Sequence, residues 1–204
     1  MESYNIVNIQ EIETFKKGES YKGEITVFTS DIGPKFLLFG NKSVYLNAFS
    51  YMLVLSGRAT LLVDSVEYPI DAHSLCILSP LHLTNFRQVS RDFQCLCLCS
   101  RKNFIDRLPI LNIQHRITHG MNMYHYPIVQ ISEEEKHLLA STMEDLRIQL
   151  FRTEHSYQLE MIQNALTRYY LEIDNILDNK GINEVTERVP QTRYANILRK
   201  SVSY

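Results

Sequence analysis

The sequence predicts an α+β protein in which a small jelly-roll type β-barrel is followed by an antiparallel helical pair. Two observations carry this prediction. Between about residues 6 and 100, short apolar and β-branched segments alternate with turn residues. From Ser132 onwards, apolar residues recur instead at steps of three and four, which is the period of a helix.

The composition is that of an ordinary globular chain. Of its 204 residues, 45% are hydrophobic and 22% charged, which is enough to bury a core. A net charge of −2 argues against a chain that holds nucleic acid by charge alone. The N-terminus has no secretion signal, and no apolar stretch is long enough to span a bilayer. Four cysteines do not make a disulfide scaffold at this length, so we expect a cytoplasmic protein with no membrane partner.

The first half is predicted to be built from short strands separated by turns. The expected strands are residues 25–29, 44–57, 59–64, 74–79 and 93–100. Turn pairs such as Gly33-Pro34, Asp64-Ser65 and Ser79-Pro80 lie between them. Short strands at this spacing favour a sandwich or small barrel. Because "YMLVL" is apolar on both faces, we expect the outside of the barrel to be covered as well.

Three of the four cysteines alternate in "DFQCLCLCS", the last of these strands. Period two puts Phe93, Cys95, Cys97 and Cys99 on one face of the strand. Neighbours on a strand face lie about 7 Å apart with parallel side chains, so adjacent cysteines cannot bridge and one strand cannot wrap a tetrahedral metal. Small, soft hydrophobes that fill a tight interior are the favoured interpretation. Whether this face looks inward stays open.

Two helices are predicted after the barrel. Ser132 and Glu135 form a capping box at the start of the first helix. The second helix runs from near 153 or 156 to about Asn179 and is closed by Gly181. Its apolar positions form a heptad seam that contains Leu159, Ile162, Leu166, Tyr169 and Ile173. Two interpretations have similar weight: the seam packs within one chain, or it meets a second copy in a dimer.

No residue pattern in the chain is a strong enzyme signature. His115 and His119 are four apart, but Arg116 stands where a zinc protease would need Glu, so they are interpreted as loop histidines. The chain has no glycine-rich phosphate loop and no nucleophile elbow. The tail 182–204 is locally basic and weakly helical, which is usual for a solvated surface.

The stretch "YMLVLSGRATLLVDSVEYPIDAHSLCILSP" resembles the sensory barrel of AraC-type transcription regulators. The shared marks are an apolar strand that ends at Gly57, a hairpin, Tyr68 before the next turn, and an apolar strand that ends at Pro80. "SRDFQCLCLCSRKNFIDRL" is similar to a subgroup of these proteins, and the helical pair with "RYANILRKSVSY" looks like their linker region. The resemblance covers most of the chain.

The resemblance implies a cupin-like barrel and allows a test for a metal site. Aligned on Gly57 and Pro80, the metal-ligand positions of metal-binding cupins fall on Val44, Leu46, Ser50 and Asn85, none of which is His or Glu. We therefore expect no metal and no cofactor. A barrel of this kind still encloses room for one small ligand. The candidate lining residues are Val44, Leu46, Ser50, Met52, Val54, His82, Asn85 and, if they point inward, Cys95 and Cys97. This mostly apolar lining favours an effector of low polarity, or no ligand at all.

The resemblance implies three segments and a regulatory function. Residues 1–128 would form the sensory barrel, 129–181 the helical dimerisation segment, and 182–204 a tail that leads towards a DNA-binding part absent from this chain. The chain would then sense a small-molecule effector and form a homodimer. It would not be an enzyme, and it would contact DNA only through the missing helix-turn-helix units. The alternatives are a cupin enzyme, such as an isomerase or dioxygenase with a metal site, and an interaction domain with a fully packed barrel.

Overall fold

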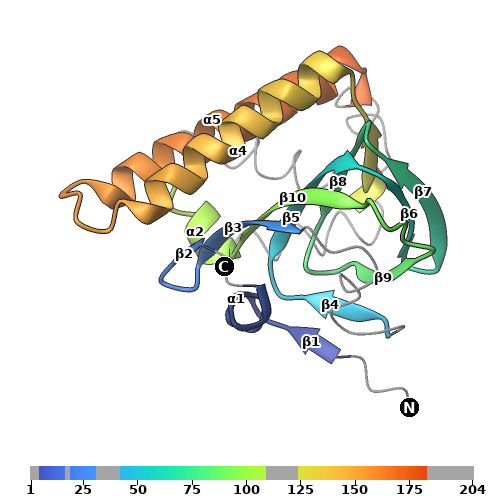
Figure 1. Ribbon diagram of the computed structural model, residues 1–204. Coiled ribbons are helices and arrows are strands. Elements are labelled where there is room, and N and C mark those ends of the chain that lie inside the picture. Colours follow the sequence, from blue (N-terminus) through green and yellow to red (C-terminus); the bar gives the residue numbers. More distant parts are fainter. Residues whose placement is uncertain (1–4, 17–18, 31–41, 109–123, 183–204) are drawn as a thin grey trace, which may run out of the picture.

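Two β-sheets face each other, and a pair of long antiparallel helices covers the outer face of one of them (Figure 1). The computed structural model describes residues 5–16, 19–30, 42–108 and 124–182. The five-stranded sheet has the order β1 (Asn5–Val7), β4 (Val44–Leu46), β9 (Leu83–Arg87), β6 (Arg58–Val63), β7 (Val66–Asp71). The six-stranded sheet has the order β11 (Ile128–Gln130), β8 (Ser74–Leu78), β5 (Phe49–Ser56), β10 (Gln94–Ser100), β3 (Ile25–Ser30), β2 (Glu19–Tyr21). The helices are α1 (Ile9–Lys16), α2 (Lys102–Ile105), α4 (Glu133–Phe151) and α5 (Gln158–Asn179). The predicted fold class is confirmed.

The single strand expected at 44–57 is two strands that belong to different sheets. β4 lies in the five-stranded sheet and β5 in the six-stranded sheet, and the chain turns between them where the Ala48 amide donates to the Leu46 carbonyl at 2.7 Å. Gly57 directly follows β5, and its φ of +74° favours glycine. A Cβ at Gly57 would also lie 2.6 Å from the Phe93 backbone, so the turn needs a residue without a side chain.

Each of the two faces of the six-stranded sheet is buried in a different core. The inner core lies between the sheets and contains Cys95, Cys97 and Cys99 of β10. The outer core lies beneath the helices and contains Leu96 and Leu98 of the same strand. The alternation predicted for "DFQCLCLCS" is therefore present, and its cysteine face looks inward. Cys76 on β8 joins that inner core, and all four thiols are free and buried.

The helical pair starts as the sequence predicts. The Glu135 amide donates to Ser132 Oγ at 3.1 Å, and the Ser132 amide donates to Glu135 Oε2 at 2.7 Å, which completes the capping box. Gly181, just past α5, has a φ of +69°. Among the helices that the structure describes, none combines the length and the apolar character needed to cross a bilayer.

The heptad seam on α5 packs within the chain, as the first of its two interpretations expects. Ile162, Leu166, Tyr169 and Ile173 are fully buried in the core beneath the six-stranded sheet, and Leu159 packs against that core while partly exposed. A helix that lies on a sheet uses the same spacing of three and four as a helix that pairs with its copy. The sheet of the same chain occupies this stripe, so these side chains are not accessible to a second copy.

The expected boundary after residue 128 falls within β11, and residues of the six-stranded sheet and of the helices share one core. β11 begins at Ile128 and pairs with β8, which carries the six-stranded sheet across that boundary. The His115 and His119 pair and the tail from residue 183 lie outside the described residues.

We predict that Leu166→Ala destabilises the fold by ~2–5 kcal/mol, because it opens a cavity in a fully buried site. Leu159→Ala, in the same seam but partly exposed, is the matched control and should lower the free energy of unfolding clearly less. Urea denaturation followed by circular dichroism measures both free energies of unfolding. Equal, small losses in the two variants would contradict the intrachain packing of the seam.

Candidate functional site

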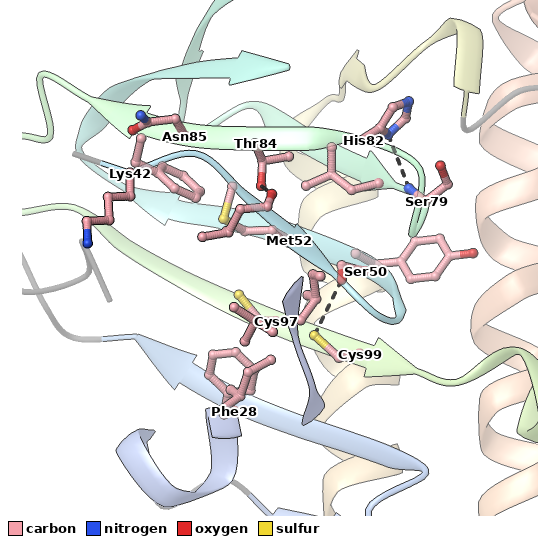
Figure 2. A pocket seen from close by; sticks show the side chains of 17 residues that line it. Phe28, Lys42, Ser50, Met52, Ser79, His82, Thr84, Asn85, Cys97 and Cys99 are labelled. Carbon is pink, nitrogen blue, oxygen red and sulfur yellow. Dashed lines mark hydrogen bonds between the residues drawn. The ribbon is translucent and has the colours of Figure 1, made fainter. Parts of the chain in front are cut away.

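A cavity of about 110 Å³ lies between the two sheets (Figure 2). By a comparable measure, one buried water needs roughly 10–15 Å³, so this space admits a small organic molecule. Its lining residues come from both sheets and from the N-terminal segment: Val7, Ile12, Phe28, Lys42, Val44, Leu46, Ser50, Tyr51, Met52, Leu78, Ser79, His82, Thr84, Asn85, Phe86, Cys97 and Cys99. Most of them are apolar.

Strand alternation explains why these residues meet. Ser50 and Met52 are two apart on β5 and point to the inner face, and their register partners on β10 are Cys99 and Cys97. In Figure 2 the sulfur atoms of both cysteines lie near Met52 and Ser50. Residues of β4 and β9 in the opposite sheet supply the facing wall.

Most of the candidates from the sequence lie around this cavity. Val44, Leu46, Ser50, Met52, His82, Asn85 and Cys97 line it, whereas Val54 and Cys95 are buried in the inner core without lining it. Sequence reasoning missed Cys99, although it shares the period-two face of Cys97. It also missed Val7 and Ile12, because the parallel pairing of β1 with β4 joins segments that are far apart in the chain.

The four positions aligned with cupin metal ligands converge on this one cavity. Val44 and Leu46 on β4, Ser50 on β5 and Asn85 on β9 all line it, which supports the alignment. Valine and leucine offer no donor, and neither the serine hydroxyl nor the amide replaces an imidazole or carboxylate. Within the described residues, no group of three or more His, Cys, Asp or Glu is arranged to hold a metal ion. The residues present therefore do not fit a cupin metal centre.

Several polar groups at the cavity are already engaged within the protein. Thr84 Oγ1 donates to the Val44 carbonyl at 3.3 Å, and Ser50 Oγ lies 3.5 Å from Cys99 Sγ. Ser79 Oγ accepts from the Leu81 amide at 3.3 Å. A ligand rich in hydroxyl groups would have to compete for these atoms, and each polar group buried without a partner costs free energy. The site therefore favours a molecule with little polar surface.

His82 is a structural histidine held in its neutral form. Its Nδ1 accepts from the Ser79 amide at 3.2 Å, as Figure 2 shows, so the proton of the neutral ring lies on Nε2. The ring stacks on Tyr124, with centroids 5.4 Å apart. Burial lowers the pKa of His82, although Asp64 and a backbone hydrogen bond with Tyr124 oppose the shift.

The thiols that line the cavity are protonated at neutral pH. Burial raises the pKa of Cys99 to about 12, with its contact to Ser50 acting in the opposite direction. A hydrogen bond with Cys95 and burial together raise the pKa of Cys97 well above the ordinary value. Because the thiolate is the nucleophile and the metal ligand, these side chains act here as small polarizable apolar groups.

One cation stands at the rim of the cavity. Lys42 precedes β4 and is exposed, yet it is part of the lining (Figure 2). An exposed ammonium beside an apolar cavity suits a ligand whose apolar body enters while an anionic end stays near water.

Comparisons with known proteins show a partial likeness in architecture. No protein-family model matches the sequence, and no curated protein matches it. Among solved structures, apo ToxT from Vibrio cholerae strain SCE256 is similar with a TM-score of 0.47 and 13% identity, over 76% of this chain and 57% of that chain. The AraC-like transcriptional activator CuxR is similar with a TM-score of 0.39 and 11% identity, over 72% of this chain and 49% of that chain. A cupin 2 conserved barrel domain protein from Salinispora arenicola CNS-205 has a TM-score of 0.30 and 17% identity, over 41% of this chain and 66% of that chain. The match thus spans 57% of that ToxT chain, and the functional argument rests on the cavity itself.

We predict that acid destabilises the protein through His82. Because burial disfavours the charged ring in the fold, this contribution to stability is complete above the unfolded pKa of about 6.5 and is lost as the pH falls below it. His82→Asn retains an acceptor for the Ser79 amide and cannot titrate, so its unfolding free energy should fall less between about pH 7 and 5. Urea denaturation across this range measures the slope. Equal slopes for wild type and His82→Asn would contradict the assignment.

Proposed function

We propose that this chain is the effector-sensing module of an AraC-type transcription regulator, and that the cavity between its sheets binds the effector. The observation that carries the proposal is the partly enclosed, mainly apolar space ringed by Val44, Leu46, Ser50 and Asn85. These are the positions at which a metal-binding cupin would carry its ligands. With apolar and uncharged residues there, the barrel keeps the ligand space and loses the means to hold a catalytic metal.

The ligand class follows from the lining. The apolar walls stabilise an apolar body, and the engaged hydroxyls of Ser50 and Thr84 offer it little in hydrogen bonding. The ammonium of Lys42 at the rim adds a site for one negative charge. The proposed effector is therefore a small apolar molecule with a single carboxylate, or with no charge.

A non-catalytic role is part of the proposal. The titratable groups of the lining include a neutral, internally bonded His82 and two protonated thiols. Tyr51, whose pKa is raised by burial, and Lys42 at the exposed rim also belong to it. General acid–base catalysis needs a group that exchanges protons near the working pH and reaches the substrate. In regulators of this type, DNA is read by separate helix-turn-helix units, so sensing and pairing are the roles proposed for this chain.

A homodimer through the exposed face of the helical pair is also proposed. Ile148 on α4 and Leu171 on α5 are large apolar side chains with 48% and 46% exposure. Each lies three residues, one helical turn, beyond a member of the cross-helix ion pair Asp145–Arg168, at 3.4 Å. This face is self-complementary in charge, as a two-fold interface requires, and it replaces the buried seam as the candidate.

Ligand binding can be tested with a fluorescent reporter, because the chain contains no tryptophan. Phe86→Trp places a single indole in the cavity wall. We expect its emission to change on titration with octanoate and with 1-octanol, which share an apolar tail. Tyr157→Trp, at a position with 67% exposure at the turn between the helices, is the control and should not respond. In the Phe86→Trp background, Lys42→Gln should weaken octanoate binding up to about fivefold and leave octanol unchanged, since an exposed ion pair contributes ~0.2–1 kcal/mol.

Two results would overturn this proposal. Emission of the Phe86→Trp protein that stays constant for both probes, together with an unchanged thermal midpoint, would leave an interaction domain with a packed barrel. A stoichiometric transition metal in the purified protein would instead favour a cupin enzyme and would refute the alignment of Val44, Leu46, Ser50 and Asn85.

The dimer interface has a separate test. Leu171→Glu places a charge within the proposed apolar contact and should shift the mass measured by light scattering from dimer to monomer. Leu81→Glu, at an equally exposed leucine in the turn after β8, is the control and should remain dimeric. A dimer that persists in Leu171→Glu and in Ile148→Glu would place the interface elsewhere.

A further inference from the structure

The cavity and the helical pair share one wall, and that wall is a single sheet thick. β5, with β8 and β10 on either side, presents Ser50 and Met52 to the cavity. Tyr51, between them in sequence, carries its ring on the opposite side, in the core beneath the helices. Tyr51 also belongs to the cavity lining, so one residue borders both the ligand space and the helical contact.

On the helical side, Tyr51 meets two consecutive residues of α5. Its ring centroid lies 5.6 Å from that of Tyr169 at an interplanar angle of 88°, and 5.3 Å from that of Tyr170 at 52°. All three side chains are buried. Contacts in this range are favourable aromatic pairs.

This arrangement fixes the rotation of α5 on the sheet. Consecutive residues on a helix project about 100° apart, because a turn takes about 3.6 residues. Tyr169 and Tyr170 therefore approach the ring of Tyr51 from different directions, and Tyr51 occupies the groove between them. Any shift of Tyr51 changes both contacts at once. Close-packed interiors absorb little displacement, so such a shift passes to the helix.

We propose that Tyr51 is the residue through which occupancy of the cavity is transmitted to α5. For the natural effector this inference rests on the proposed function, since it needs a ligand in that cavity. A molecule against Ser50 and Met52 presses on the backbone on both sides of Tyr51, and the tyrosine moves with that backbone. The response at α5 is a coupling free energy, so it requires that the filled and empty cavities favour different packings of the three rings.

The test compares cavity filling with and without Tyr51. In one arm the wild type is filled with octanol. In a second arm Ser50→Leu fills the cavity from β5, and Leu46→Phe fills it from the opposite sheet, so that no ligand is needed. Hydrogen exchange of the α5 amides around Leu166 to Ile173 is the readout. We expect filling to change their exchange rates by roughly fivefold or more, the lower end of typical couplings, and we expect Tyr51→Leu to abolish the change.

Matched variants separate coupling from a loss of stability. Leu53→Ala truncates another buried residue on the same outer face of β5 and should keep the α5 response. Tyr51→Phe keeps the ring and loses only the hydroxyl, so this variant should keep most of the α5 response. If Tyr51→Leu does not fold, Tyr170→Leu removes one of the two ring contacts from the helix side and should reduce the response.

The outcomes distinguish this inference from the proposed function. Octanol binding by the Phe86→Trp protein, with an α5 response that survives Tyr51→Leu, would overturn the role of Tyr51 and leave the function standing. No probe binding, with an α5 response to Ser50→Leu or Leu46→Phe that disappears in Tyr51→Leu, would refute the sensing function and support the coupling. An α5 that responds to no form of filling would refute the coupling outright.

Discussion

Burial of the six-stranded sheet on both faces is the constraint on which the rest of the structure depends. A strand in that position is mostly apolar, as β5 is from Tyr51 to Leu55 and β10 is from Cys95 to Cys99. The inner residues must then find a facing sheet, and the outer residues must find helices. This explains why the apolar stripe of α5 is buried against the sheet of the same chain. It also explains why the cavity and the helical pair are separated by one strand layer.

The inner face shows what such a layer permits chemically. Each polar group placed there has to be bonded within the protein, as His82 is to the Ser79 amide and Thr84 is to the Val44 carbonyl. The remaining wall is made of aliphatic, aromatic and sulfur-bearing side chains. Thiols with a raised pKa fit this environment, because burial disfavours the thiolate. A site of this character favours the proposed ligand through shape and apolar area, and among the described lining residues Lys42 supplies positive charge at the rim.

The sequence predicted those elements whose pattern has a single structural cause. The capping box at Ser132 and the alternation from Cys95 to Cys99 are local, and both are present. β7 and β9 were not expected as strands, because β7 contains Pro69 and both are rich in polar residues. The inward side of β10 could not be decided, because both of its faces are apolar. Closure of the cavity by Val7 and Ile12 depends on a pairing between distant segments, which leaves no local signal.

The heptad seam shows why a period alone does not identify a partner. Spacing of three and four reports that one side of a helix is buried, and a sheet of the same chain satisfies it as well as a second helix does. What distinguishes the two is the exposed remainder, since a surface that pairs copies must stay accessible after the chain has folded. On α4 and α5 that remainder includes Ile148 and Leu171 beside a balanced ion pair. On its buried side α5 contacts Tyr51, which belongs to the cavity wall. On its other side α5 forms part of this exposed face. A rotation of α5 would therefore alter the geometry of both, which is the link that the proposed sensor requires.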